Sequence, residues 1–292
     1  WLERFGPERT EALLKTNNER PPLTVRIKQP EQYREKVATT LVEEGIKAAP
    51  GDYLSEALNL LELPHSLEES AAFKKGWITP QDESSMLVAH LVNPKPGEFI
   101  VDLCAAPGGK STHLAELMND QGSIISLDDH PHKVNLIKEN ARRLNLTAIQ
   151  PQVADARTFI LPGKGQADAV LVDAPCSGTG VLRRRVDARY RREFKDLDQL
   201  AQLQREILQQ AATLVKPGGR LVYSTCTLEP EENQKQSEWF LANHPDFELA
   251  DYRAYLPGNL SNYLETEGQW WVTLLPATNG GDGFFICRFN RR

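Results

Sequence analysis

The sequence contains little cysteine and no long apolar run, and both shortages exclude classes of protein. Its four cysteines, at positions 104, 176, 226 and 287, form no C-x-x-C pair and have no histidine at zinc-finger spacing. A structural zinc site and a disulfide framework are therefore not expected. No stretch approaches the roughly 20 apolar residues that span a bilayer, and the first residues do not form a signal peptide. We expect a cytoplasmic protein with no membrane partner and no metal.

The beginning of the chain and its length bear on its organisation. The first of the 292 residues is Trp1 rather than methionine, which indicates a piece of a longer protein. Residues 1–75 combine a Pro-rich turn, a short alternating strand and a helix that stops at Gly45, which predicts a small α/β segment. From Gly76 to residue 292 the pattern of strand, turn and helix repeats. We therefore expect two parts, 1–75 and 76–292.

Continuous apolar runs with helices between them predict the fold of the second part. Runs such as FIVDLC, SIISLD and DAVLVDAP are each followed by a turn and a helical pattern. Strands of this kind are buried on both faces of a mostly parallel sheet, with helices on each face. The tail, WWVTLLPATNGGDGFFICRF, predicts an antiparallel hairpin. The fold class expected is α/β and Rossmann-like, with ligands at the carboxyl ends of the strands.

The Gly-rich turn DLCAAPGGKST, residues 102–112, lacks two well-known patterns. The dinucleotide pattern G-x-G-x-x-G is absent, which disfavours a nicotinamide or flavin enzyme. The phosphate-binding pattern fits at Gly109, Lys110 and Ser111, but Cys104 stands where its first glycine is required. Because AVLVD ends at Asp173 like the magnesium-binding strand of such proteins, an ATPase remains an alternative.

S-adenosylmethionine accounts for more of the strand ends. This cofactor needs a small-residue turn beside its amino-acid end, an acid after the next strand for the ribose, and a polar group after the third strand for adenine. Asp128 and Asp155 stand at those two strand ends. An aspartate at a strand end is also a common helix cap, so the argument depends on their order and number.

Two cysteines, Cys176 and Cys226, close strand-like segments in turns rich in Gly, Ser and Thr. Methylation of cytosine at C5 needs a thiolate that adds to C6, an acid that supports N3 and a base that removes the C5 proton. Asp173 with Cys176, and Thr225 with Cys226, supply such groups on adjacent predicted strands. Either thiol alone is more often a packing residue, and the residues themselves leave open which one attacks.

The sequence as a whole carries a net charge of −6, but one segment is basic. RRRVDARYRREFK, residues 183–195, contains seven basic and two acidic residues and directly follows DAPCSGTG. Such a patch can neutralise phosphates on an otherwise acidic protein, but the charges alone favour a solvated basic helix. Only together with the sequence motifs do we expect an RNA partner along it. The expected RNA-binding residues are Arg183, Arg184, Arg185, Arg189, Arg191 and Arg192.

The motifs DLCAAPGGKS, DAPCSGTG, YSTCT with EPEEN, and GDGFF together resemble the RNA (cytosine-5) methyltransferase family of Sun, NOL1/NOP2 type. The resemblance covers nearly the whole chain and is strongest for the bacterial RsmB (Sun, Fmu) branch. The N-terminal NusB-like domain of that branch has no counterpart in this sequence. It implies that Cys226 is the nucleophile and that Cys176 helps to release the product. It also implies a class I S-adenosylmethionine-dependent methyltransferase domain, preceded by an RNA-binding segment.

The resemblance further implies which residues form the site. The implied cofactor-binding residues are Cys104, Ala105, Ala106, Pro107, Gly108, Gly109, Lys110, Asp128, Asp155 and Asp173. Lys110 and Asp173 would also reach the target base. The implied reaction forms 5-methylcytosine in RNA, with 16S ribosomal RNA as substrate. We also expect a monomer. The alternatives are methylation of tRNA or another ribosomal RNA, the ATPase, and a non-catalytic RNA-binding module.

Overall fold

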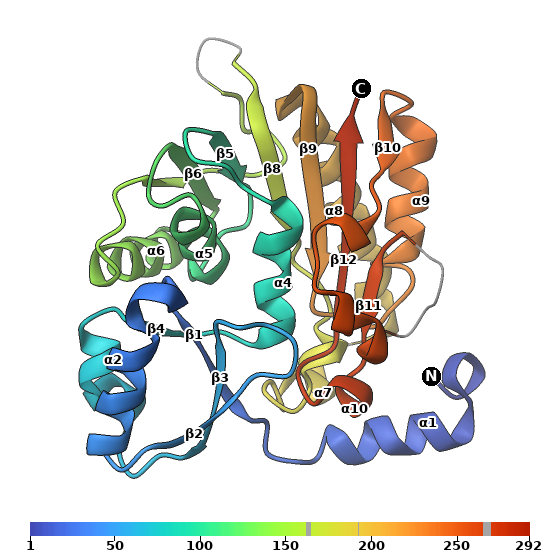
Figure 1. The fold of residues 1–292 in the computed structure, drawn as a ribbon. Helices are drawn as coiled ribbons and strands as arrows, with labels where there is room; N and C mark the ends of the chain where they lie inside the picture. Colours follow the sequence, from blue (N-terminus) through green and yellow to red (C-terminus); the bar gives the residue numbers. More distant parts are fainter. Residues whose placement is uncertain (162–164, 192, 265–269) are drawn as a thin grey trace.

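The structure is a computed structural model that describes residues 1–161, 165–191, 193–264 and 270–292. It contains two sheets, and Figure 1 shows the smaller one beneath the left side of the larger one. In the described part of the chain, none of the helices combines the length and the apolar character that crossing a bilayer requires.

The small sheet is antiparallel throughout and has the spatial order β2-β3-β1-β4. Its strands are β1 (Leu23–Ile27), β2 (Lys47–Pro50), β3 (Ala57–Glu62) and β4 (Ile78–Pro80). The accompanying helices are α1 (Leu2–Thr16), α2 (Pro30–Glu43), η1 (Leu67–Glu69) and α3 (Ala71–Lys74). The strand expected before Gln29 and the helix expected up to Gly45 are β1 and α2.

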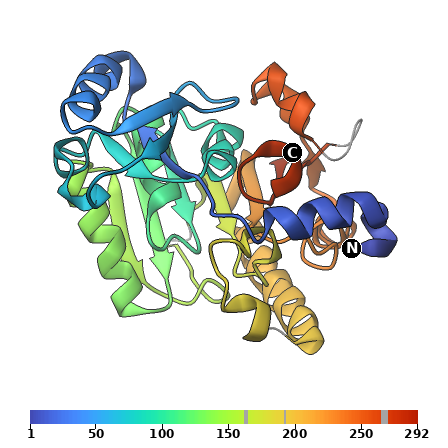
Figure 2. The same ribbon diagram turned by 90° about the horizontal axis from the view of Figure 1, so that it is seen from below.

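The small sheet extends beyond Lys75, where we expected the first part to end. Strand β4 pairs with β1 from Val25 to Ile27, and Ile78 is buried in the core of this sheet. We therefore propose that the division between the two parts falls after Pro80. Helix α1 does not cover the small sheet. It packs beside α10, as Figures 1 and 2 show. Leu13 of this helix is buried with Leu228 and Leu275.

The large sheet has the order β10-β12-β9-β8-β5-β6-β7, and β11 pairs with β12. The strands are β5 (Phe99–Asp102), β6 (Ser123–Asp128), β7 (Ile149–Val153), β8 (Ala167–Asp173), β9 (Val215–Thr225), β10 (Phe247–Leu249), β11 (Val272–Leu274) and β12 (Phe284–Arg291). Strands β5 to β9 are parallel, whereas β10, β11 and β12 pair antiparallel, which confirms the expected tail hairpin.

Helices cover both faces of the large sheet because its strands are apolar on both sides. In β5, Ile100 belongs to the core beneath α4, α5 and α6, and Val101 to the core beneath α8 and α9. The helices and 3₁₀ turns are α4 (Glu83–Val92), α5 (Gly109–Leu117), α6 (Pro131–Arg143), η3 (Thr179–Val181), α7 (Ala188–Arg191), α8 (Phe194–Leu214), α9 (Gln234–Asn243), η4 (Tyr252–Ala254), η5 (Gly258–Tyr263) and α10 (Pro276–Asn279).

A buried ion pair joins the small sheet to helix α5. Arg26 in β1 is 1% exposed, and its Nε lies 2.9 Å from the Glu116 carboxylate in α5. The same guanidinium donates to the Gly109 carbonyl oxygen and to Thr112 Oγ1, each at 3.2 Å. The small sheet therefore contacts the helix that begins at the Gly-rich turn.

Removing one partner of this pair should destabilise the protein strongly. Arg26→Met leaves the Glu116 carboxylate buried without its cation, and we expect the free energy of unfolding to fall by about 3–5 kcal/mol. Urea unfolding followed by far-UV circular dichroism measures the change. The double variant Arg26→Met, Glu116→Leu should recover much of the loss. A single-variant loss below about 1 kcal/mol, the range of exposed pairs, would contradict this account.

Candidate active site at the carboxyl edge of the parallel sheet

The largest group of predicted site residues surrounds one cavity of about 440 Å³. The cavity lies where β5, β8 and β9 end, and residues at the ends of β1 and β4 complete its wall. The predicted residues in its lining are Cys104, Ala105, Ala106, Pro107, Gly109, Lys110, Asp173, Arg184, Arg185 and Cys226. The carboxyl ends of parallel strands thus meet at the edge where a ligand site was expected.

The two cysteines face one another across adjacent strands. Cys176 follows β8, Cys226 follows β9, and their Sγ atoms are 3.4 Å apart. A hydrogen bond from the Cys176 thiol lowers the pKa of Cys226. Burial and Asp173 act against this shift, whereas the charges of Lys110 and Arg185 support it. The same contact and burial raise the pKa of Cys176, so Cys226 is the thiol that ionises more readily.

This difference predicts the pH dependence of alkylation. The pKa of Cys226 lies below the ordinary cysteine value, so iodoacetamide should modify it at lower pH than a free cysteine. In Cys176→Ala the donor is lost, and the midpoint should move to higher pH. Mass spectrometry of peptide 221–235 between about pH 6 and pH 10 measures it. Cys287, whose pKa burial raises to about 12, should react more slowly than Cys226. An unchanged midpoint in the variant would contradict the assignment.

Lys110 and Asp173 form an ion pair at the cavity wall. Lys110 Nζ donates to Asp173 Oδ2 at 2.7 Å, and Ser224 Oγ donates to Oδ1 at 2.8 Å. The ammonium group also lies 5.2 Å from the centre of the Phe284 ring. Both carboxylate oxygens of Asp173 therefore accept a hydrogen bond. The Lys110–Asp173 pair offers a donor and an acceptor to a planar ligand beside the thiols.

The Gly-rich turn takes a conformation that its small residues permit. Gly108 has φ 105°, and a Cβ added there would lie 3.2 Å from the Ile137 backbone, so a larger residue is excluded. At Gly109 no atom lies within 4 Å of the position of a Cβ, which leaves open space at the start of α5. Burial raises the pKa of the Cys104 thiol well above its usual range, which fits a packing role within the turn.

Asp128 and Asp155 lie at the ends of neighbouring strands but are not in the lining of the cavity that Cys226 lines. Gly108 and Cys176 are not in this lining either, although Cys176 contacts Cys226. Asp128 accepts a hydrogen bond from the His130 backbone N–H at 3.1 Å and lies 3.4 Å from Lys133 Nζ. Asp155 pairs with Arg157, whose hydrogen bonds lower the pKa of the carboxyl. This arginine partner was not identified in the sequence analysis. A ligand that contacts Asp155 therefore shares it with Arg157.

The predicted RNA-binding arginines differ in their surroundings. Arg183 is only 7% exposed and pairs with Asp282 at 3.2 Å. Arg184 pairs with both Asp82 and Asp282, and Arg189 donates to Asn18 Oδ1 at 2.7 Å. Arg191 is exposed and lies 3.7 Å from the Asp187 carboxylate. Arg192 lies outside the described residues. Arg185 is exposed and lines the cavity, which makes it the best placed of the set.

Two functional candidates were not found by sequence reasoning. Glu232 and Asn233, part of EPEEN, are fully buried and hydrogen-bond to the segments that carry the two cysteines. The stretch was noted only as part of a motif. The one available signal was the presence of three acids and an amide directly after a buried strand.

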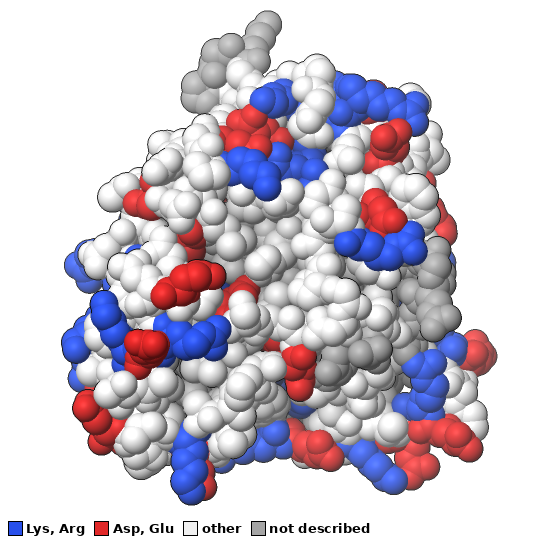
Figure 3. All heavy atoms as spheres, in the orientation of Figure 1, with Lys and Arg blue, Asp and Glu red and all other residues white. Residues whose placement is uncertain are grey.

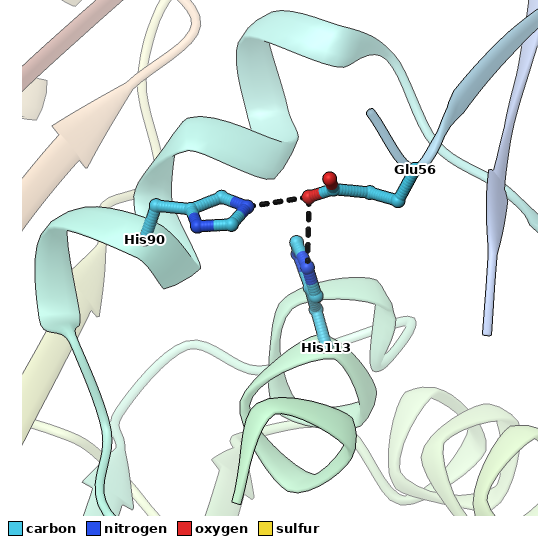
Figure 4. A group of neighbouring side chains, drawn as sticks. All are labelled: Glu56, His90 and His113. Carbon is cyan, nitrogen blue, oxygen red and sulfur yellow. Dashed lines mark hydrogen bonds and ion pairs between the residues drawn. The ribbon is translucent and has the colours of Figure 1, made fainter. Parts of the chain in front are cut away.

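A second polar cluster lies away from the cavity. Figure 4 shows Glu56 between His90 and His113, which come from α4 and α5. His90 Nε2 hydrogen-bonds to Glu56 Oε1, and His113 Nε2 lies 3.6 Å from the same oxygen. Burial and the charge of Arg26 lower the pKa of His113 to about 3, so this ring is neutral. The cluster links the small sheet to α4 and α5.

The strand order and the cavity define a Rossmann-like class I methyltransferase fold of the S-adenosylmethionine-dependent type. The crystal structure of PH0851 is similar to this chain, with a TM-score of 0.91 and 34% identity over 99% of this chain and 64% of that one. A methyltransferase homolog protein from Pyrococcus horikoshii has a TM-score of 0.82 and 28% identity, over 100% of this chain and 93% of that one.

The particular family follows from the sequence matches. The model of 16S rRNA methyltransferase RsmB/F matches residues 89–290, and that of the RsmF/B-like, ferredoxin-like domain matches residues 1–65. The chain belongs to this RsmB/F methyltransferase family. It is 42% identical to the probable ribosomal RNA small subunit methyltransferase B of Bacillus subtilis and 38% identical to that of Synechocystis. The matches cover 100% and 99% of this chain, but only 65% and 64% of those relatives.

Proposed function

We propose that this chain transfers a methyl group from S-adenosylmethionine to C5 of a cytosine in RNA, with bacterial small-subunit ribosomal RNA as substrate. The observation that carries the proposal is the pair of thiols 3.4 Å apart, next to the Lys110–Asp173 ion pair. The family favours methyl transfer over ATP hydrolysis and over a non-catalytic module. A monomeric state, the absence of a metal and a cytoplasmic location stay predictions.

The residues at the carboxyl edge fit S-adenosylmethionine. The turn 104–109 has open space at Gly109, and the carboxylates of Asp128 and Asp155 follow the next two strands. We propose that the turn holds the amino-acid end, that Asp128 accepts the ribose hydroxyls and that Asp155 lies toward the adenine. When bound, this cofactor supplies an electrophilic methyl group.

The proposed chemistry begins with the Cys226 thiolate, which adds to C6 of the cytosine and forms a C–S bond. The ring electrons then reside at N3 and C5, and Asp173 and Lys110 line the same cavity as Cys226, where they would contact the ring edge. C5 would then bond to the methyl group while the methyl–sulfur bond of S-adenosylmethionine breaks, and the cofactor would leave as the neutral thioether S-adenosylhomocysteine. A base then removes the C5 proton, the C5–C6 double bond re-forms, and the C–S bond breaks to return the Cys226 thiolate. We assign this proton removal to Cys176 or to a group acting through it.

The target base must leave its stack to reach these thiols, which costs a few kcal/mol and favours single-stranded RNA or an opened junction. Arg185 lines the cavity and would contact phosphate beside the extruded base. On the face shown in Figure 3, Lys and Arg side chains lie among Asp and Glu side chains. We therefore expect a few local phosphate contacts rather than attraction over this whole face.

The test of this function is methyl transfer followed by analysis of the modified nucleoside. The protein is incubated with S-adenosylmethionine that carries a deuterated methyl group and with small-subunit ribosomal RNA, and the RNA is digested for mass spectrometry. Deuterated 5-methylcytidine is expected, and it should be absent with Cys226→Ser. Methylation of tRNA or large-subunit RNA instead would correct the substrate, and label on another nucleoside would overturn the reaction.

A further inference from the structure

A single buried carboxylate ties together the residues on both sides of Cys176. Glu232 is 0% exposed, and its Oε1 accepts the Ser177 backbone N–H at 2.8 Å. The Ser177 hydroxyl donates to the other carboxylate oxygen. Gln204 Nε2 donates to Glu232 Oε1 at 2.9 Å and to the Pro175 carbonyl oxygen at 3.0 Å. Because Pro175 and Ser177 flank Cys176, this network fixes the backbone that carries the Cys176 thiol.

The next residue does the same for the other cysteine. Asn233 is also 0% exposed, and its Nδ2 donates to the Thr227 carbonyl oxygen at 2.9 Å. Its Oδ1 accepts from Thr225 Oγ1 at 2.5 Å. Thr225 and Thr227 flank Cys226. Two consecutive side chains, those of Glu232 and Asn233, thus hold the two turns that carry the thiols.

The two halves of this network are also linked to each other and to the sheet. The hydroxyls of Ser177 and Thr227 are 2.7 Å apart, and the Gly180 N–H donates to the Cys226 carbonyl oxygen at 3.0 Å. Tyr223 in β9 donates its hydroxyl to the Glu232 carbonyl oxygen at 2.6 Å. Hydrogen bonds between buried groups are electrostatically stronger than those exposed to water. The spacing of the thiols therefore depends on Glu232 and Asn233.

We propose that Glu232 and Asn233 are positioning residues with separate tasks: Glu232 places Cys176 for release of the product, and Asn233 places Cys226 for attack. This inference rests on the proposed function. Neither side chain lines the cavity, so both act through the turns they hold. Because a displacement of about 1 Å can cost roughly 100-fold in rate, each loss should slow one step more than the other.

Glu232→Gln in the full chain separates the two steps. The amide keeps one acceptor for the Ser177 N–H, but its NH2 group cannot accept the hydrogen of the Ser177 hydroxyl. That hydroxyl must turn to another acceptor, which loosens the Cys176 turn. We expect turnover to fall by about 10- to 100-fold while adduct formation continues, so a denaturant-stable protein–RNA adduct accumulates as in Cys176→Ala. In Asn233→Asp, the acceptor for Thr225 is kept and the donor to Thr227 is lost. Adduct formation itself should slow, and no adduct should accumulate.

The controls distinguish a positioning role from a general loss of structure. Glu231→Gln is the matched control, because this neighbouring carboxylate pairs with Lys235 and does not bond to either turn; it should behave like wild type. Circular dichroism and cofactor affinity should be unchanged in the variants. If Glu232→Gln does not fold, Gln204→Leu is tested in its place, because it removes two hydrogen bonds of the same network. The adduct should again accumulate, but to a smaller extent.

Two results with folded Glu232→Gln would overturn the inference and leave the proposed function intact. One is turnover at the wild-type rate, and the other is an equal slowing of adduct formation and of release. If wild type transfers no methyl group and Cys176→Ala forms no adduct, the proposed function fails, and the inference fails with it.

Discussion

Replacing Cys226 by alanine is expected to abolish both methyl transfer and covalent attachment to RNA. The Cys226 thiol is the more acidic of the pair, because it accepts the hydrogen bond of Cys176 and lies near Lys110 and Arg185. Without a thiolate at this position C5 of cytosine stays a poor nucleophile. The single-turnover rate should fall by a factor on the order of 10⁴ or more, as for other covalent nucleophiles.

The control for this variant is another cysteine of the same sheet. Cys287 is fully buried in β12 and takes no part in the cavity lining, so Cys287→Ala should keep methyl transfer if the protein remains folded. Affinity for S-adenosylmethionine, measured by calorimetry, should be unchanged in Cys226→Ala, because the Gly-rich turn is intact. Residual turnover within about 10-fold of wild type would contradict the role of Cys226 as nucleophile.

Replacing Cys176 by alanine is expected to have a different effect, the accumulation of an RNA adduct. Attack by Cys226 should continue at neutral pH, although more slowly, because the donor that lowers the pKa of Cys226 is lost. Release should almost stop, since the group assigned to removal of the C5 proton is missing. Denaturing gels of protein mixed with RNA and S-adenosylmethionine should show a slowly migrating band that wild type lacks.

The result that would contradict this assignment is the reverse pattern. If Cys226→Ala traps the adduct and Cys176→Ala does not, the attacking thiol is Cys176. The double variant Cys176→Ala, Cys226→Ala should show no adduct. This result would establish that the band depends on a cysteine of this pair.

The parallel sheet was predictable because burial on both faces leaves a direct pattern in the sequence. Ile100 and Val101 point into different cores, so β5 had to be apolar at successive positions. The proximity of the two thiols was predictable for a similar reason. Cys176 and Cys226 each follow an apolar run, and the ends of adjacent parallel strands lie side by side. The order of β8 and β9 in the sheet then brings them within contact.

Long-range polar partners could not be predicted in this way. The sequence pattern placed Arg183 and Arg184 in a basic surface patch. Both form ion pairs with Asp282, which lies about 100 residues further along the chain. No periodicity links the two segments. The same holds for Arg26 in β1 and Glu116 in α5, which are 90 residues apart in the chain. Strand β4 was missed because three residues are too few to show an alternating pattern.

The measurement that tests the central claim most directly is the identification of the cysteine that bonds to RNA. Small-subunit RNA containing 5-fluorocytosine traps the adduct, because fluorine at C5 cannot leave as the proton does. Wild-type protein, this RNA and S-adenosylmethionine are combined and digested with trypsin and nuclease. The account predicts the nucleotide on peptide 221–235, which contains Cys226. A nucleotide on peptide 165–183, which contains Cys176, would contradict it.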